Sequence, residues 1–351
     1  MIRAGGGQRA RVRPPGPRRL RAIGLPLLLV AVLALVPIFF PAELNWLGIG
    51  FLTFIFVTLA ISWNLVGGYA GQISFGYAAF FGVGAYVTAN LWGRLDWPPV
   101  LTLPVAGLAA VLLSLLVGLP CFRLVGPYFS IATIGVGEAA RVLALNLDQL
   151  TGGASGMNLP LGVPDKSWFY WSGLALAAAT FAVSAWVRSS RLGLGLVALR
   201  MDQSAAESLG LNAALYKNLA HSLSAFQVGV AAGLYAVYFS YVHPDQVFGF
   251  SLSIGMVLMG VIGGVGTLWG PVLGAAIYYP VRQYVLSQPH LVAFNLLIYG
   301  GLLIVIVLFE PGGLMGVLAR LGALARPTVR AENPLVGQSS EARETGEPGG
   351  V

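Results

Sequence analysis

The sequence is a succession of apolar runs, each long enough to cross a bilayer, that follow one another from residue 23 to residue 309. An α-helix needs about 20 mainly apolar residues to span the hydrocarbon layer. The composition agrees, since 57% of the residues are hydrophobic and only 9% are charged, whereas soluble globular domains carry about 25% charged residues. Because backbone groups inside a bilayer need hydrogen-bond partners within the chain, the runs predict an all-α integral membrane protein.

The apolar windows predict a polytopic bundle of about ten transmembrane helices, and a count of eight stays open because the boundaries are soft. With the N-terminus inside and an even number of spans, most Lys and Arg residues fall on the cytoplasmic side, as the positive-inside rule requires. Both termini are therefore expected in the cytoplasm. The predicted spans are 23–40, 47–66, 75–92, 99–120, 128–147, 168–187, 215–240, 249–267, 271–287 and 292–309.

This pattern divides the chain into three parts. Residues 1–22 are expected to form a basic cytoplasmic tail, residues 23–312 the transmembrane domain, and residues 313–351 a cytoplasmic, largely disordered tail. The chain carries a net charge of +7, but most of it lies in the tails and one loop. We therefore expect contacts with membrane lipids and none with nucleic acid.

Other classes of site lack their sequence signatures. Cys121 is the only cysteine, and the three histidines are far apart, so neither an intrachain disulfide nor a metal site is expected. The zinc motif H-E-x-x-H and the nucleophile motif G-x-S-x-G are absent as well. We expect no catalytic residue in this chain.

One polar segment, residues 188–216, interrupts the apolar pattern in the middle of the chain. Asp202 is a good N-cap, with Ser204–Glu207 as an alternative capping box, and Gly210 is a natural C-terminal stop. Asn212 would cap the next span. The segment predicts a two-turn helix on the membrane surface, with one face formed by Ala205, Ala206 and Leu209. Such a short helix needs a surface to pack on, and both a solvated connector and a docking element for a cytoplasmic partner fit.

Four stretches of the sequence together resemble the permease subunits of ABC importers for branched-chain amino acids, in the longer, M-type form. They occur in order along the chain: NLVGGYAGQISFGYAAFFGVGAYVTA (64–89), YFSIATIGVGEAARVLALNLDQLTGGASGM (128–157), ALRMDQSAAESLGLNAALYKNLAHSLSAFQVGVAAGLYA (198–236) and GGVGTLWGPVLGA (263–275).

The resemblance implies that residues 23–312 are a permease domain in a bacterial-type inner or plasma membrane. It implies as partners a second homologous permease, two cytoplasmic ABC ATPase subunits and an extracytoplasmic solute-binding protein. The segment 188–216 would carry the helix that couples the permease to an ATPase. The coupling residues implied are Arg200, Asp202, Ala205, Ala206, Glu207, Leu209 and Gly210.

The chain has no phosphate-binding G-x-x-x-x-G-K-[ST] loop. We therefore expect no cofactor in this chain, with ATP and Mg bound by the partner ATPases. Alternative functions are a permease for urea, short amides or aromatic acids, a self-sufficient secondary transporter or channel, and a polytopic membrane enzyme.

Three polar groups are candidates for a solute pathway. Glu138 and Arg141 lie three residues apart in a predicted span, where charges are costly and usually face the bundle interior or water. They fit the two charges of an amino acid, and they also fit a structural ion pair between helices. The loop 151–157 has small residues and clustered N–H groups that can hold a carboxylate, or it is a flexible turn. The candidates in this loop are Thr151, Gly152, Gly153 and Ser155.

The polar break at 67–77 is the third group. Asn64, Gln72 and Ser74 can offer hydrogen bonds to a solute, as broken helices do in transporters. Helix packing is the simpler role for the glycines there and for the pair Gly270 and Gly274, which also suits an interface with a second permease.

Overall fold

The computed structural model describes residues 26, 29–35, 46–124, 126–160, 165–292, 294–310 and 312–324, which are almost entirely helical. The longer helices are α2 (Trp46–Asn64), α3 (Tyr77–Leu95), α4 (Pro99–Cys121), α5 (Pro127–Asn146), α7 (Lys166–Ser189), α8 (Arg191–Met201), α10 (Ala213–Phe239), α12 (Phe250–Gly263), α13 (Gly270–Ser287), α15 (Asn295–Phe309) and α16 (Gly313–Leu324). The short elements are the π-helix η1 (Leu65–Tyr69), α6 (Asp148–Thr151), η2 (Gly153–Ser155), α9 (Gln203–Ser208), α11 (Pro244–Val247) and α14 (Pro289–Val292). β1 (Met157–Asn158) pairs antiparallel with β2 (Tyr241–Val242).

Nine of the ten predicted spans coincide with described helices to within a few residues, while most of the first, 23–40, lies outside the described residues. Among the described residues, six helical segments are long and apolar enough to cross a membrane: Trp46–Tyr69, Pro99–Cys121, Pro127–Asn146, Lys166–Ser189, Ala213–Phe239 and Pro244–Gly263. The all-α polytopic fold is confirmed. The total of ten spans and the cytoplasmic position of both termini stay predictions.

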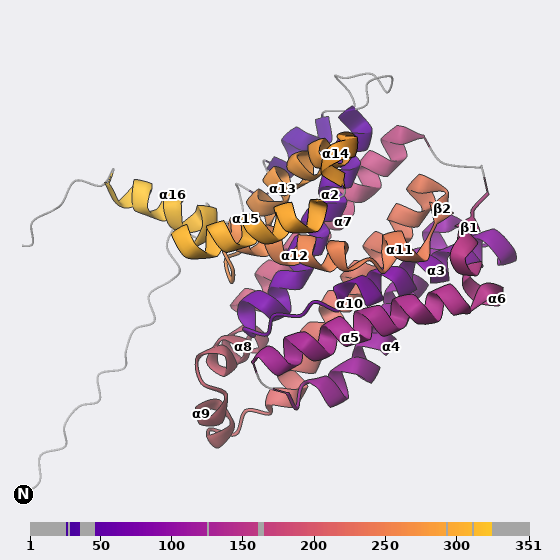
Figure 1. The fold of residues 1–351 in the computed structure, drawn as a ribbon. Helices are drawn as coiled ribbons and strands as arrows, with labels where there is room; N and C mark the ends of the chain where they lie inside the picture. The colour runs from indigo at the N-terminus through magenta and orange to yellow at the C-terminus, as the bar shows by residue number, and fades with distance from the viewer. Residues whose placement is uncertain are drawn as a thin grey trace, which may run out of the picture.

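The helices form a bundle around α10, which packs against α2, α3 and α4 (Figure 1). Large aromatic side chains fill the centre of this bundle, and Trp63, Tyr77 and Phe80 are each at most 1% exposed. Figure 1 shows α8 and α9 together at one end of the bundle, called here the α9 end. The elements α6, β1 and β2 lie at the other, called the β end.

The polar break after α2 has a defined shape. The helix ends in the single π-turn η1, residues 70–76 are not helical, and α3 begins at Tyr77. This connecting segment is held by its carbonyl groups, since Trp63 Nε1 donates to the oxygen of Ser74 at 3.0 Å and Ser130 Oγ donates to that of Ile73 at 2.6 Å. Single π-turns are often found at functional sites. The predicted break is confirmed.

The structure adds two helices that the sequence predictions did not name. The first half of the polar segment 188–216 is an eleven-residue helix, α8, because Ser190 caps it and Leu196 and Leu199 bury an apolar face against neighbouring helices. Within the tail of residues 313–351, which are expected to be largely disordered, residues 313–324 form α16, whose first turn packs on α12 and α13. The rest of that tail, like residues 1–22, lies outside the described residues.

Gly270 and Gly274 form an internal packing face between α12 and α13. A Cβ atom on Gly274 would overlap the carbonyl oxygen of Met259, and Gly270 lies against the backbone of Gly263 and Gly264. Close approach of two helices through small residues is common in membrane proteins. The predicted packing role is confirmed, and this face is used within the chain.

We expect Gly274→Ala to lower the free energy of unfolding by about 1–3 kcal/mol, because the added methyl group must push α12 and α13 apart. Titration of the purified chain with SDS, followed by circular dichroism, measures the change. Gly300→Ala on α15 is the matched control, since a Cβ there meets open space. Equal stability of the two variants would contradict close packing at Gly274.

Candidate functional site

A cluster of charged side chains lies on the surface where α5 meets α11. Arg141 donates from Nε to both oxygens of Glu138 at 3.1 Å, and from a terminal nitrogen to Asp245 Oδ1 at 2.6 Å. Glu138 lies one turn before Arg141 on α5, whereas Asp245 comes from α11, 104 positions later. Two carboxylates therefore share one guanidinium, which leaves a net charge of −1. We call these three residues the α5 cluster.

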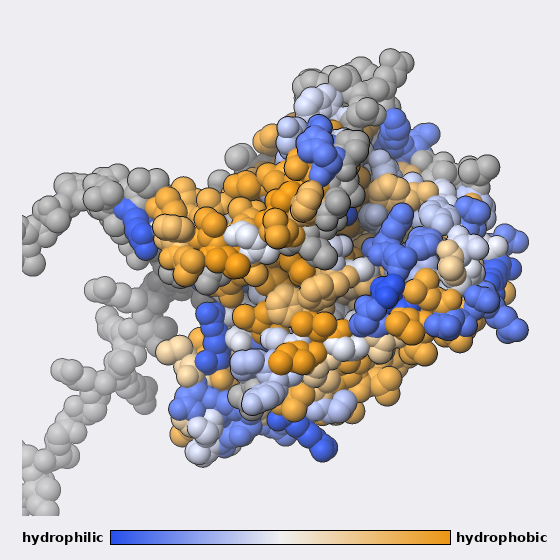
Figure 2. Space-filling model, in the orientation of Figure 1, coloured by the Kyte–Doolittle hydropathy of each residue, from blue (hydrophilic) through white to orange (hydrophobic). Residues whose placement is uncertain are grey.

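The α5 cluster faces away from the core of this chain. The side chains of Arg141, Glu138 and Asp245 are 29%, 52% and 54% exposed. In the most apolar stretch of α5, only 22% of the residues are buried within this chain. Figure 2 shows hydrophilic surface over the α5 and α11 region with apolar surface on both sides. Because charges exposed to hydrocarbon are costly, this face requires water or a partner chain.

His243 ties the same region to the loop at the β end. The backbone N–H of Asp245 donates to His243 Nδ1 at 3.2 Å, so this nitrogen is an acceptor and the ring proton belongs on Nε2. His243 Nε2 then donates to the carbonyl oxygen of Ala154 at 3.0 Å. Through these two hydrogen bonds, the ring links α11 to the loop that contains Ala154.

The loop 151–157 is ordered by its own hydrogen bonds. Thr151 Oγ1 donates to the carbonyl oxygen of Leu147 at 2.9 Å and accepts from the N–H of Gly153 at 3.2 Å. The N–H groups of Gly152, Ser155 and Gly156 donate to backbone carbonyls inside or next to the loop. β1 pairs with β2, and the Tyr241 hydroxyl donates to the oxygen of Ser155 at 2.9 Å. Most N–H groups of the loop therefore already have acceptors, and the role of the loop in solute binding stays a prediction.

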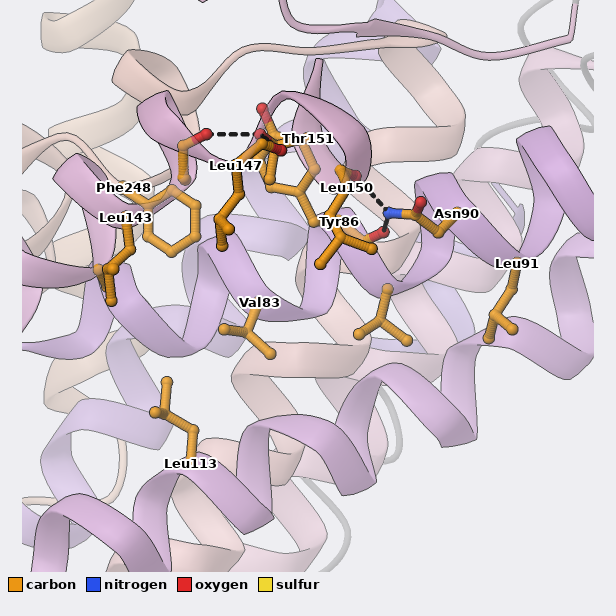
Figure 3. Close-up of a pocket in the computed structure, with 13 residues that line it drawn as sticks. Val83, Tyr86, Asn90, Leu91, Leu113, Leu143, Leu147, Leu150, Thr151 and Phe248 are labelled. Carbon is orange, nitrogen blue, oxygen red and sulfur yellow. Dashed lines mark hydrogen bonds between the residues drawn. The ribbon is translucent and has the colours of Figure 1, made fainter. Parts of the chain in front are cut away.

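An apolar pocket of about 460 Å³ opens between α3, α4 and α5 (Figure 3). Its lining includes Tyr86, Leu113, Leu143 and Phe248, and Figure 3 shows these side chains facing the cavity. Asn90, at its rim, donates to the carbonyl oxygen of Leu150 at 2.9 Å. The volume lies within the range of about 300–1,000 Å³ that is typical of ligand pockets, and the lining suits an aliphatic group.

The three candidates at the polar break have different roles. Asn64 is fully buried and bridges the turn between α12 and α13, accepting from the N–H of Gly266 at 2.8 Å and donating to the oxygen of Thr267 at 2.9 Å. Ser74 accepts from the N–H of Gly76 at 3.3 Å. Both are used in holding the backbone.

Gln72 differs from them, because its side chain is 8% exposed and its Oε1 has no hydrogen-bond partner among the described residues. Of the three candidates, it alone has a buried polar atom free for a ligand.

The break contacts α5, the helix that carries Glu138 and Arg141. The N–H of Phe75 donates to Thr133 Oγ1 on α5 at 3.1 Å. Glu138 follows Thr133 by five residues, which is about 8 Å along a helix axis. α5 therefore links the residues of the break to Glu138 and Arg141. Among the described residues, no hydrogen bond joins a side chain of the break directly to a side chain of the α5 cluster.

The predicted short helix exists as α9. Asp202 is its N-cap, accepting from the N–H of Ala205 at 3.0 Å and from Ser204 Oγ at 2.7 Å, and these bonds lower the pKa of the Asp202 carboxyl. The alternative capping box is not used. Gly210 follows the helix with a φ of +89°, as expected for its C-terminal stop, and Asn212 caps α10.

The faces of α9 differ from the prediction. Ala206 alone is buried, against Leu199 and Ala213. Leu209 is 86% exposed and Ala205 and Glu207 are exposed as well, because the chain turns at the end of α9 and directs Leu209 away from the bundle. Arg200 belongs to α8 and not to the short helix, and it donates to the carbonyl oxygen of Gly68 at 2.6 Å.

Sequence analysis missed three of the residues in these sites. Asp245 and His243 lie in the stretch YVHPDQV, where a carboxylate next to an apolar span was a usable signal. Lys217 is 2% exposed, and its Nζ donates to Gln203 Oε1 at 2.7 Å, which ties α10 to α9. A lysine near the start of a span gave no sign of this partner.

Comparisons with known proteins agree on one family. The model of the family described as "Branched-chain amino acid transport system / permease component" matches residues 45–307. The chain is 29% identical to the Escherichia coli (strain K12) protein named "High-affinity branched-chain amino acid transport system permease protein LivM", over 88% of this chain and 77% of that protein. The Salmonella typhimurium (strain LT2) protein of the same name is 28% identical, over 75% and 68%. No solved structure matches significantly.

Proposed function

The chain belongs to the branched-chain amino acid transport system permease family, and on this premise we propose that it is the M-type permease of an ATP-driven importer for branched-chain and other hydrophobic amino acids. It is a multi-pass protein of the inner membrane and a transport permease, not an enzyme. The substrate, the direction and the subunits named below are part of the proposal.

The α5 cluster is the observation that carries the proposed pathway. The cluster is net negative and partly exposed, and it lies on α5, a helix of which little is buried inside this chain. Such a charged surface fits a water-filled route better than contact with hydrocarbon. An amino acid has one ammonium and one carboxylate, and the cluster offers two carboxylates and one guanidinium to receive them. The apolar pocket beside Phe248 supports an aliphatic side chain over urea or a short amide. A second homologous permease would close the route on the open side of α5.

The exposed surface of α9 supports the proposed coupling. Leu209, Glu207 and Ala205 point away from the bundle, while Ala206 and the capping by Asp202 hold the helix in place. A rigid short helix with an exposed apolar residue at the cytoplasmic surface is suited to the groove of a partner protein. We propose that one of two ABC ATPase subunits docks there, and that the two ATPases bind ATP and Mg. We also propose that this chain holds no cofactor itself and that an extracytoplasmic binding protein delivers the solute.

Deletion of this chain in its native host is expected to remove high-affinity uptake of radiolabelled leucine, isoleucine and valine, and re-expression is expected to restore it. Gentle extraction of the tagged chain should bring down an ATPase and a second permease, identified by mass spectrometry. Uptake of urea and of phenylalanine measures the alternative substrates. If the chain is extracted alone and leucine uptake is unchanged by its deletion, a self-sufficient transporter becomes the better proposal.

A further inference from the structure

Arg200 connects the docking helix to the polar break within the bundle. It lies at the end of α8, two residues before the N-cap of α9, and a terminal nitrogen of its guanidinium donates to the carbonyl oxygen of Gly68 in η1 at 2.6 Å. The last carbonyls of a helix have no partner inside the helix. A cation at this position satisfies one of them and also opposes the negative end of the helix dipole.

Arg200 is exposed overall, and two glycines beside it leave space for its side chain. A Cβ atom on Gly71 would lie 2.7 Å from Cγ of Arg200, and one on Gly266 would lie 2.7 Å from its guanidinium nitrogen. Gly266 is in the turn that Asn64 clamps, so Arg200 lies between the end of η1 and the α12–α13 turn. Its position is therefore defined by two elements that are far apart in the sequence.

α8 has the contacts of a rigid connector. Leu196, which is fully buried, packs in one apolar cluster with Leu65, Val66 and Tyr69 of η1. On the other side, Leu199 packs against Ala206 of α9. A displacement of α9 therefore moves α8 as well, and the Arg200 bond gives α8 a directional contact with the break.

From the break, contacts continue to the α5 cluster. The carbonyl oxygen of Ile73 accepts from Ser130 Oγ at 2.6 Å, and the N–H of Phe75 donates to Thr133 on α5. Glu138 and Arg141 follow on the same helix. The described residues thus form an unbroken set of contacts from the proposed docking surface to the proposed pathway.

We propose that Arg200 is a positioning residue that transmits movement of the docked α9 to the segment 70–76, through its bond to Gly68. This inference rests on the proposed function, because it requires an ATPase on α9. Arginine suits the role, since its planar guanidinium stays charged and has several donors in a fixed geometry. Loss of this bond is expected to uncouple ATP hydrolysis from transport without releasing the ATPases.

The test measures how ATP changes the accessibility of the break. Ile73 is 45% exposed, so Ile73→Cys in a Cys121→Ser background places one thiol there. Membranes containing the whole importer are treated with a maleimide, with and without ATP and vanadate. With Arg200 present, nucleotide is expected to change the labelling rate by at least about fivefold, the size of a typical coupling between sites. With Arg200→Met the change should disappear and leucine uptake should fall, while copurified ATPase and its hydrolysis stay within about twofold.

Arg191→Met, at the exposed first turn of α8, is the matched control and should retain the nucleotide response. An unchanged response and unchanged uptake in Arg200→Met would overturn the proposal. The proposal would also be overturned if both Arg200→Met and Arg200→Lys lost thermal stability and assembly together with the nucleotide response. Arg200 would then be a structural residue only. If the unmodified chain brings down no ATPase, the proposed function itself fails, and this result is independent of Arg200.

Discussion

The double variant Glu207→Arg, Leu209→Asp is expected to reduce both copurified ATPase and leucine uptake at least tenfold, while the permease itself stays folded. Leu209 is 86% exposed and Glu207 is exposed on α9, so neither contributes to the core of this chain. A docked partner would bury Leu209 and would meet a reversed charge beside it. Central residues of an interface typically contribute about 2 kcal/mol or more to binding, so a loss of at least about tenfold follows.

The matched control for this variant is Glu207→Gln, Leu209→Met, which keeps the apolar side chain and reverses no charge. Both forms should extract with the same yield and the same thermal stability. If the charge-reversed form still brings down its ATPases and supports normal uptake, α9 is only a connector between α8 and α10.

The second large effect is expected at the α5 cluster. Arg141→Met leaves the carboxylates of Glu138 and Asp245 close together without their cation. Hydrogen bonds to charged groups contribute about 1.5–3 kcal/mol, which is a factor of about 10 to 100 in an equilibrium constant. We expect leucine uptake to fall by a factor in this range, measured as initial rates over a series of leucine concentrations.

Two further variants separate a pathway from a structural ion pair. Glu138→Gln and Asp245→Asn each remove one carboxylate, and in a pathway they should raise the apparent KM for leucine. Arg94→Met, an exposed arginine in the last turn of α3, is the control and should be neutral. If all three cluster variants keep normal uptake kinetics but unfold at lower temperature, the cluster only ties α11 to α5.

The sequence predicted those features that depend on neighbouring residues. The lengths of the apolar runs predicted nine spans to within a few residues. This works because a helix in a bilayer must pair its own backbone N–H and C=O groups across the full thickness of the hydrocarbon layer. The caps at Asp202 and Asn212 were predicted for a similar reason, since each side chain bonds an N–H three residues later in the chain. The four stretches that resemble the permease family are likewise continuous pieces of sequence.

The contacts that define the candidate sites could not be predicted from the sequence, because they join side chains on helices that are far apart in the chain. Arg141 is within reach of Glu138 by helix periodicity, yet its bond to Asp245 needs α11 beside α5. Likewise, the bond from Arg200 to Gly68 crosses 132 positions. Periodicity placed Leu209 on one face with Ala206, but only the structure shows that Leu209 is exposed while Ala206 is buried.

Apolar length, caps and glycine turns by themselves determined where nine of the spans lie and where the short helix α9 begins and ends, because those choices depend on hydrogen bonds within a few residues. Which polar side chains meet was decided only by the tertiary structure. The spans are similar in length and apolar character, so their order and rotation in the bundle follow from close packing at positions such as Gly274 and Asn64, which join distant parts of the chain.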